Sequence, residues 1–229
     1  MQAMQNTDQE PMPDTTPTEP KQKQHTPRQV SPVLEKLFEL HPNLFGAKFL
    51  PLKLGIFHDL LARHPDAFKK DELKLAMGQH ARSTRYLECV AARLDRHDLD
   101  GVAVEPVAPE HVHHAILEVF RRRQARSKDD LRPRLTMLLK QAIENSGLTL
   151  DDYAALVRVQ DEATNALLDD AMTELKAEAA KREALMVTFK ASGKTEAEFA
   201  DMYGMNLKLV GSVLARVRAE EATKTDALT

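Results

Sequence analysis

The chain has 229 residues, and its 32 Lys and Arg are outnumbered by 35 Asp and Glu, which gives a formal charge of −3 at pH 7. Its single cysteine excludes a disulfide framework within one chain, and no apolar run approaches the roughly 20 residues that a membrane span requires. A nucleic-acid surface would therefore depend on basic residues sorted onto one face, because bulk positive charge is absent.

The first 30 residues are rich in Gln, Thr, Pro and Lys and nearly lack large apolar side chains. Such a segment cannot bury enough surface to offset its ordering entropy, so we predict a disordered tail over 1–30. The segment also lacks the charged-then-apolar pattern of a signal peptide. Together with the single cysteine, this favours a reducing, cytoplasmic location.

Ordered structure is predicted from Ser31 onward. Ser31 and the proline that follows it form a typical helix start, and His41 with its following proline ends that helix. Three more helices are expected within the next stretch: one that Pro51 opens, one that Asp71 caps, and one over about 83–94.

An Asp-Gly pair at Asp100 predicts a β-hairpin. His97 and Leu99 precede the pair, and Val102 and Val104 follow it. These residues are compatible with strands, so we expect one short two-stranded ribbon.

Basic residues recur throughout these helices, together with the aromatic Tyr86. Lysines and arginines beside an aromatic ring suit a phosphate chain with an unpaired, stackable end. The same residues would also serve simply to solvate helix faces, since nearby acidic residues offset most of their charge. Both interpretations remain open at the level of composition.

The segments LPLKLGIFHDLL, KDELKLAM, STRYLECV and RHDLDG, in this order and spacing, resemble the FinO/ProQ family of bacterial RNA chaperones over about residues 31–125. The resemblance implies a mostly helical domain that binds structured RNA, especially hairpins with single-stranded 3′ tails such as terminators, small RNAs and mRNA 3′ ends. Gly78 and Thr84 depart from relatives that carry a basic and an aromatic residue there. Carried over by position, the RNA-binding residues of the family fall on Lys53, Lys70, Lys74, Arg85, Tyr86 and Arg96.

The helix that Pro109 opens ends in a run of arginines. Arginines in a last helical turn favour the helix dipole and are equally able to clamp phosphates. Within the same helix, His111 and His114 have the spacing of metal ligands, but no second ligand cluster accompanies them, so we predict no metal site. Possible additional RNA contacts are Arg82, Arg93, Arg121, Arg122 and Arg123.

The second half of the chain has few strand-forming residues and repeated helical patterns. This composition predicts a helical extension over 127–219. A long helix with an acidic face is expected from Asp161 to Glu183. The segment 195–218 is similar to a helix-turn-helix, which supports an alternative hypothesis of a DNA-binding transcriptional regulator. A helical protein–protein scaffold is the third hypothesis, and residues 220–229 are expected to be a disordered tail.

Enzyme chemistry finds little support in the sequence. The glycines are scattered singly, without a phosphate-binding loop, and Cys89 has no activating neighbours. We therefore predict a protein that is not an enzyme, has no cofactor, and uses neither a membrane nor a small-molecule substrate.

The predicted architecture is all-α with one short β-hairpin. A tail (1–30) leads into a FinO/ProQ-like domain (31–126), a helical extension (127–219) and a second tail (220–229). The predicted function is an RNA chaperone in post-transcriptional regulation, with RNA as its partner. Tyr86 is expected to hold the RNA 3′ end and to contribute little to stability.

Overall fold

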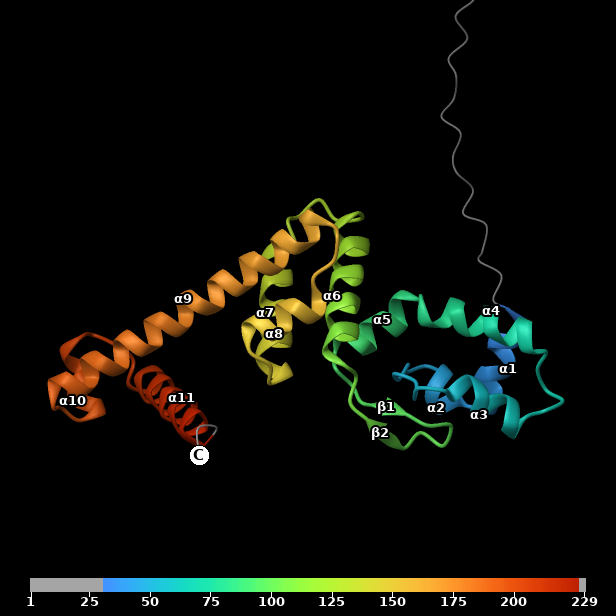
Figure 1. Cartoon of the computed structure of the whole chain (residues 1–229), viewed down its shortest axis with the longest axis horizontal. Coiled ribbons are helices and arrows are strands. Elements are labelled where there is room, and N and C mark those ends of the chain that lie inside the picture. The colour runs from blue at the N-terminus through green and yellow to red at the C-terminus, as the bar shows by residue number, and fades with distance from the viewer. Residues whose placement is uncertain (1–30, 227–229) are drawn as a thin grey trace, which may run out of the picture. The chain divides into compact units, whose positions relative to one another are not determined.

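The computed structural model describes residues 31–226, and within them it is helical apart from one two-stranded hairpin (Figure 1). This confirms the predicted fold class of an all-α protein with one short β-hairpin. The expected tail over 1–30 lies outside the described residues. No helix in the described part of the chain is both long and apolar enough to cross a membrane.

The elements of the first half include all those expected from its sequence. In chain order they are α1 (Pro32–Leu40), α2 (Pro42–Phe45), α3 (Ile56–Arg63), α4 (Lys70–Ala81), α5 (Thr84–Ala91), β1 (Arg96–His97), β2 (Ala103–Glu105) and α6 (Pro109–Gln124). Two of these helices, α3 and α4, begin at other residues than expected. Pro51 lies in extended backbone, and α4 begins after Lys69, with Asp71 in its first turn instead of at the cap.

The hairpin turn is stabilised by a single carboxylate. Asp98 accepts hydrogen bonds from the amides of Asp100 (2.9 Å) and Val102 (3.0 Å), as short polar side chains do in tight turns. Gly101 completes the turn with φ 77°, a conformation that favours glycine. The Asp-Gly prediction is therefore confirmed at this position.

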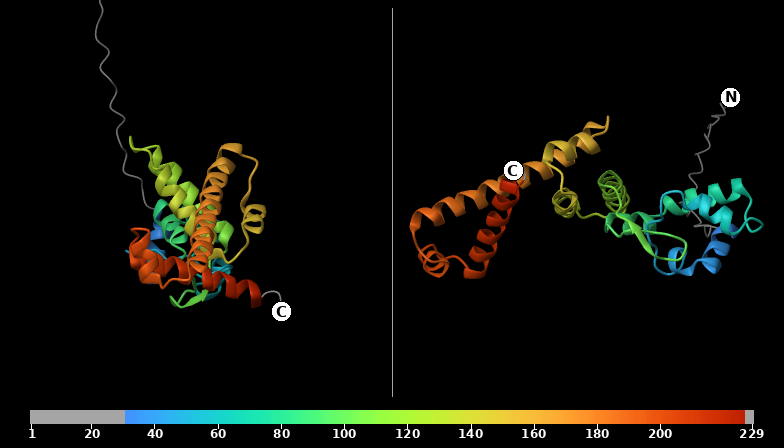
Figure 2. Two further views of the ribbon diagram at one scale, coloured as in Figure 1. Left: turned by 90° about the vertical axis from the view of Figure 1, so that its left-hand side faces the viewer. Right: turned by 60° about the horizontal axis from the view of Figure 1, so that its bottom comes forward.

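The second half contains only helices within the described residues: α7 (Arg132–Ser146), α8 (Leu150–Val157), α9 (Glu162–Ser192), α10 (Glu196–Met202) and α11 (Leu207–Asp226). The views in Figure 2 show α9 as one unbroken helix. It extends beyond the expected end, to a left-handed glycine at Gly193. Helix α11 also continues to Asp226, into the stretch expected to be a tail.

The main apolar core spans the predicted boundary between residues 126 and 127. It joins Leu37, Leu73 and Ile116 of the first half to Leu135 and Leu139 of α7, all of them nearly or fully buried. The boundary at 126 stays a prediction about independent folding. The packing shows that α7 covers α6 and shares its core.

Two smaller cores lie along α9. The first packs Ile143, Tyr153 and Leu168 among α7, α8 and the N-terminal half of α9. The second packs Met186, together with Phe199 and Leu214 of the returning helices α10 and α11, around the C-terminal half of α9. A helix of 31 residues thus contributes to both of these clusters, and its Ala171 also packs in the main core.

Candidate nucleic-acid interface

The segment Pro51–Lys53 is held in an extended conformation beside the hairpin. The amide of Lys53 donates to the carbonyl of His97 (2.9 Å), and the amide of His97 donates to the carbonyl of Pro51 (2.8 Å). Leu52 therefore forms a parallel bridge with His97. This pairing, followed by a left-handed Gly55, explains why α3 starts at Ile56 and not at Pro51.

Two of the predicted RNA-binding residues form hydrogen bonds with the backbone of the same segment. The hydroxyl of Tyr86 accepts a hydrogen bond from the amide of Leu52 (3.0 Å), and Nη1 of Arg96 donates to the carbonyl of Leu52 (2.9 Å). Tyr86 and Arg96 are 9% and 8% exposed. Burial raises the pKa of Tyr86, so its hydroxyl stays protonated at neutral pH. Both side chains thus position Lys53, and their direct contact with RNA stays a prediction.

A cluster of tilted aromatic rings connects α4, α5 and the loop after α2. The buried ring of His80 lies 4.5 Å from Phe49 and 5.1 Å from Tyr86, measured between ring centroids. Desolvation lowers the pKa of His80 to about 4, so the ring is neutral at neutral pH. The guanidinium of Arg85 lies over Phe49, 4.4 Å from the ring centroid, and donates to the carbonyl of Ala47.

A group of basic side chains in this region has no carboxylate partner among residues 31–226. We call this group, which consists of Lys48, Lys70, Lys74, Arg82 and Arg85, the open cations. All five side chains are exposed. Lys70 and Lys74 lie one turn apart on α4, and Arg82 ends that helix. The sequence prediction missed Lys48, which has no periodic pattern around it.

Lys53 differs from the open cations because an acid already binds it. Its Nζ lies 2.9 Å from Asp59, and this hydrogen bond raises the pKa of the lysine. The pair borders a depression that also contains Asp98 and Asp100. Since both partners are more than a third exposed, water and salt screen the pair, and a phosphate can compete with Asp59.

Four of the five additional arginines are tied to the protein itself. Arg93, in a left-handed conformation with φ 58°, donates to the carbonyl of Asn145 at the end of α7 (2.8 Å). Arg121 binds Asp161 and Thr164, at the start of α9. Arg122 bonds to Glu118, to Thr84 and to the carbonyl of Arg82, and Arg123 pairs with Glu88.

These arginines therefore stabilise the fold in the described structure. Arg82 and Arg93 have no carboxylate partner in residues 31–226, and the guanidinium of Arg93 already donates to the carbonyl of Asn145. The histidines on α6 point to different partners as well. His113 is buried against the hydroxyl of Tyr153 (3.2 Å), and His111 lies beside Arg96.

The segment that is similar to a helix-turn-helix uses its arginines internally. Arg216 pairs with Glu144 and Glu220, and Arg218 pairs with Glu196. A capping box at Thr195 starts α10, as its sequence predicts. The geometry of a helical hairpin is present, but its arginines already have acidic partners, so no contact here favours DNA readout.

Comparison with known proteins decides the family. Residues 27–132 match the sequence model of the ProQ/FINO family. This segment is a ProQ/FINO family domain. Proteins named RNA chaperone ProQ from Shewanella pealeana and Idiomarina loihiensis are each 41% identical over 87 residues, which is 36% of this chain. The match covers 41% and 42% of those relatives, so this ProQ/FINO chain spans about two fifths of their length.

Two solved structures are also similar to the ProQ/FINO chain. A ProQ homologue from Legionella pneumophila is 30% identical, with a TM-score of 0.36, and the match covers 50% of this chain and 99% of the homologue. NMB1681 from Neisseria meningitidis MC58, described as a FinO-like RNA chaperone, is 28% identical with a TM-score of 0.34. That match covers 38% of this chain and 89% of NMB1681.

Proposed function

We propose that this ProQ/FINO protein is a cytoplasmic RNA chaperone in post-transcriptional regulation that binds hairpins with single-stranded 3′ tails without catalysing a reaction. The observation that carries the proposal is the set of open cations within the family domain of an acidic chain. Exposed lysines and arginines without acidic partners are available to replace the counterions of a phosphate backbone.

The start of α5 supports an anion-binding role for this region. Ser83 caps the helix by accepting from the amide of Tyr86, while the first amides of a helix have no acceptor within it. The positive end of the helix dipole adds to the charge of Arg82 and Arg85, which flank this turn. A phosphate or hydroxyl at an RNA end is the kind of group that such a site accepts.

Lys53 would join the interface by exchanging Asp59 for phosphate. Tyr86 and Arg96 then act as positioning residues, because they fix the backbone on which Lys53 lies. Replacing Asp59→Asn removes the competing charge and leaves a side chain of similar size. We expect RNA affinity to rise by about two- to fivefold at low salt, consistent with an exposed ion pair. Unchanged affinity in the Asp59→Asn variant would remove Lys53 from the interface.

The proposal is tested by comparing three nucleic acids in gel shifts at fixed salt. The full chain should bind an RNA hairpin with a 3′ uridine tail more tightly than the same hairpin without its tail. It should bind both more tightly than duplex DNA of equal length. Equal or tighter binding of duplex DNA would favour the DNA-binding regulator, and failure to bind any of the three would favour the protein scaffold.

A further inference from the structure

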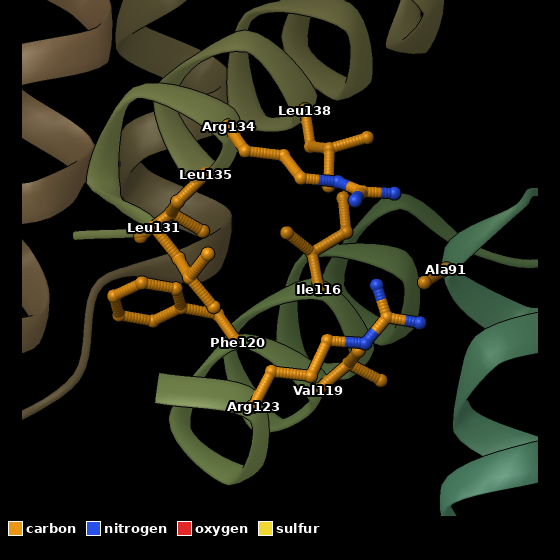
Figure 3. Close-up of a pocket in the computed structure, with 9 residues that line it drawn as sticks. All are labelled: Ala91, Ile116, Val119, Phe120, Arg123, Leu131, Arg134, Leu135 and Leu138. Atoms are coloured by element: carbon orange, nitrogen blue, oxygen red, sulfur yellow. The ribbon is translucent and has the colours of Figure 1, made fainter. Parts of the chain in front are cut away.

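A cleft lies between α6 and α7, and none of the open cations lines it (Figure 3). Ile116 and Val119 of α6 and Leu135 and Leu138 of α7 line it, and Ala91 closes one side from the end of α5. The cleft is small, with a cavity volume of about 40 Å³. Its walls are almost entirely apolar, although it opens to solvent beside exposed arginines.

Two guanidinium groups border this cleft. Figure 3 shows the side chains of Arg123, from α6, and Arg134, from α7, extending toward the side on which Ala91 lies. Arg123 pairs with Glu88 at 2.7 Å. Arg134 has no carboxylate within ion-pair distance in the described part of the chain. The rim therefore carries more positive than negative charge.

An apolar cleft with a cationic rim is complementary to a flat apolar group that carries an anion. A nucleotide has this combination, since its base has two apolar faces and its phosphate a full negative charge. A purely apolar peptide would leave the guanidinium of Arg134 without an acceptor. Charge complementarity therefore favours RNA over a peptide as the occupant.

The cleft is also continuous with the proposed interface through α5. Arg122 donates to the carbonyl of Arg82, one of the open cations, and to the hydroxyl of Thr84. One turn further along α5, Glu88 holds Arg123 at the rim. A strand bound at the start of α5 would follow this seam to reach the cleft.

We infer that the cleft is a second RNA subsite, in which one single-stranded nucleotide places its base over the mouth of the cleft, beside Leu138, and its phosphate at Arg134, which has no carboxylate partner in the described part of the chain. The inference rests on the proposed RNA binding and extends it beyond the family domain. The family match ends at position 132. Arg134, Leu135 and Leu138 of α7 follow that position, and Leu131 comes just before it.

The three isoleucines of the chain provide a direct test in methyl NMR of the full-length protein. Ile116 lies in the cleft, Ile56 lies beside the Lys53 segment, and Ile143 packs in the separate core under α8. Titration with an RNA hairpin that carries a 3′ uridine tail should shift the signals of Ile116 and Ile56 and leave Ile143 unchanged.

The possible outcomes separate this inference from the proposed function. A shift of Ile56 without a shift of Ile116 would overturn the second subsite and leave RNA binding intact. If the hairpin does not bind at all in gel shifts, the proposed function fails, and the subsite fails with it.

A matched pair of arginine variants gives the second readout. Arg134→Ala removes the rim charge, whereas Arg132→Ala removes the same charge from the same helix at a side chain that is 75% exposed and outside the cleft. Arg134→Ala should weaken binding of the tailed hairpin by about fivefold and lower the salt slope by about 0.7. It should also abolish the Ile116 shift. Equal effects of the two variants would overturn the inference.

Discussion

The open cations of the family domain and the two arginines of α11 differ in whether an acid already binds them. On α4 and at the start of α5, Lys70, Lys74 and Arg85 have no acidic partner within residues 31–226. On α11, Arg216 and Arg218 are each held by glutamates. The comparison shows that the placement of acids, more than the number of bases, decides which surface of an acidic chain can attract phosphate.

Helix α6 lies between these two groups in the sequence, and its arginines are paired like those of α11. Arg121 binds the start of α9, and Arg122 and Arg123 bind carboxylates on α6 and α5. An arginine run at a helix end is therefore not sufficient evidence for a nucleic-acid surface. Here Arg121 connects α6 to α9, whereas Arg122 and Arg123 bind within the family domain.

The largest expected effect comes from removing the extension, which tests how separable the family domain and the helical extension are. A chain that ends at Arg126 loses Leu135 and Leu139 from the main core, and each buried leucine contributes about 2–5 kcal/mol. We expect this truncation to lose cooperative thermal unfolding in circular dichroism. A chain that ends at Ala180 keeps these residues and should stay folded and bind RNA.

These truncations also test the predicted boundary at 126. A stable, RNA-binding fragment ending at Arg126 would show that α7 is dispensable and that the family domain folds alone. Loss of RNA affinity in the chain that ends at Ala180 would show that α10 and α11 contribute to binding, contrary to the comparison.

The next largest effect concerns Tyr86, which the sequence suggested as an RNA contact with little role in stability. Because the ring is buried and its hydroxyl accepts from the amide of Leu52, Tyr86→Ala should lower the free energy of unfolding by about 3–5 kcal/mol. Tyr86→Phe keeps the ring and removes only the acceptor, at a cost of about 1–3 kcal/mol. Urea unfolding measures both values.

The phenylalanine variant separates positioning from direct contact. If Tyr86 positions Lys53, then Tyr86→Phe should weaken binding of tailed and tailless hairpins by similar factors. A loss confined to the tailed hairpin would instead support the predicted contact with the RNA 3′ end. An unfolding free energy that Tyr86→Ala leaves unchanged would contradict the structural role.

Local signals made much of this fold predictable from sequence. Caps at Ser83, Thr149 and Thr195 act within three residues, and each begins a helix. The start at Pro51 was wrong because a distant partner, His97, pairs with that segment and keeps it extended. A local helix signal cannot anticipate such a pairing.

The candidate site was less predictable for the same physical reason. Tyr86 and Arg96 form hydrogen bonds with Leu52, which lies 34 residues from Tyr86 and 44 residues from Arg96 in the chain. The acidic partners of Arg121 and Arg123 lie on other helices. Residue type and spacing identify candidate cations, but only tertiary structure shows which cations already have a partner.

The salt dependence of RNA binding in two matched double variants shows whether the open cations contact phosphate. Lys70→Ala with Lys74→Ala removes two open cations, and Lys194→Ala with Lys208→Ala removes two exposed lysines from the extension. Because only the first pair is expected to contact phosphate, it should weaken binding of the tailed hairpin roughly tenfold and lower the log–log salt slope by about 0.7–0.9 per lost contact. The second pair should leave affinity and slope close to wild type. Equal losses in the two double variants, or no loss in the first, would contradict the account.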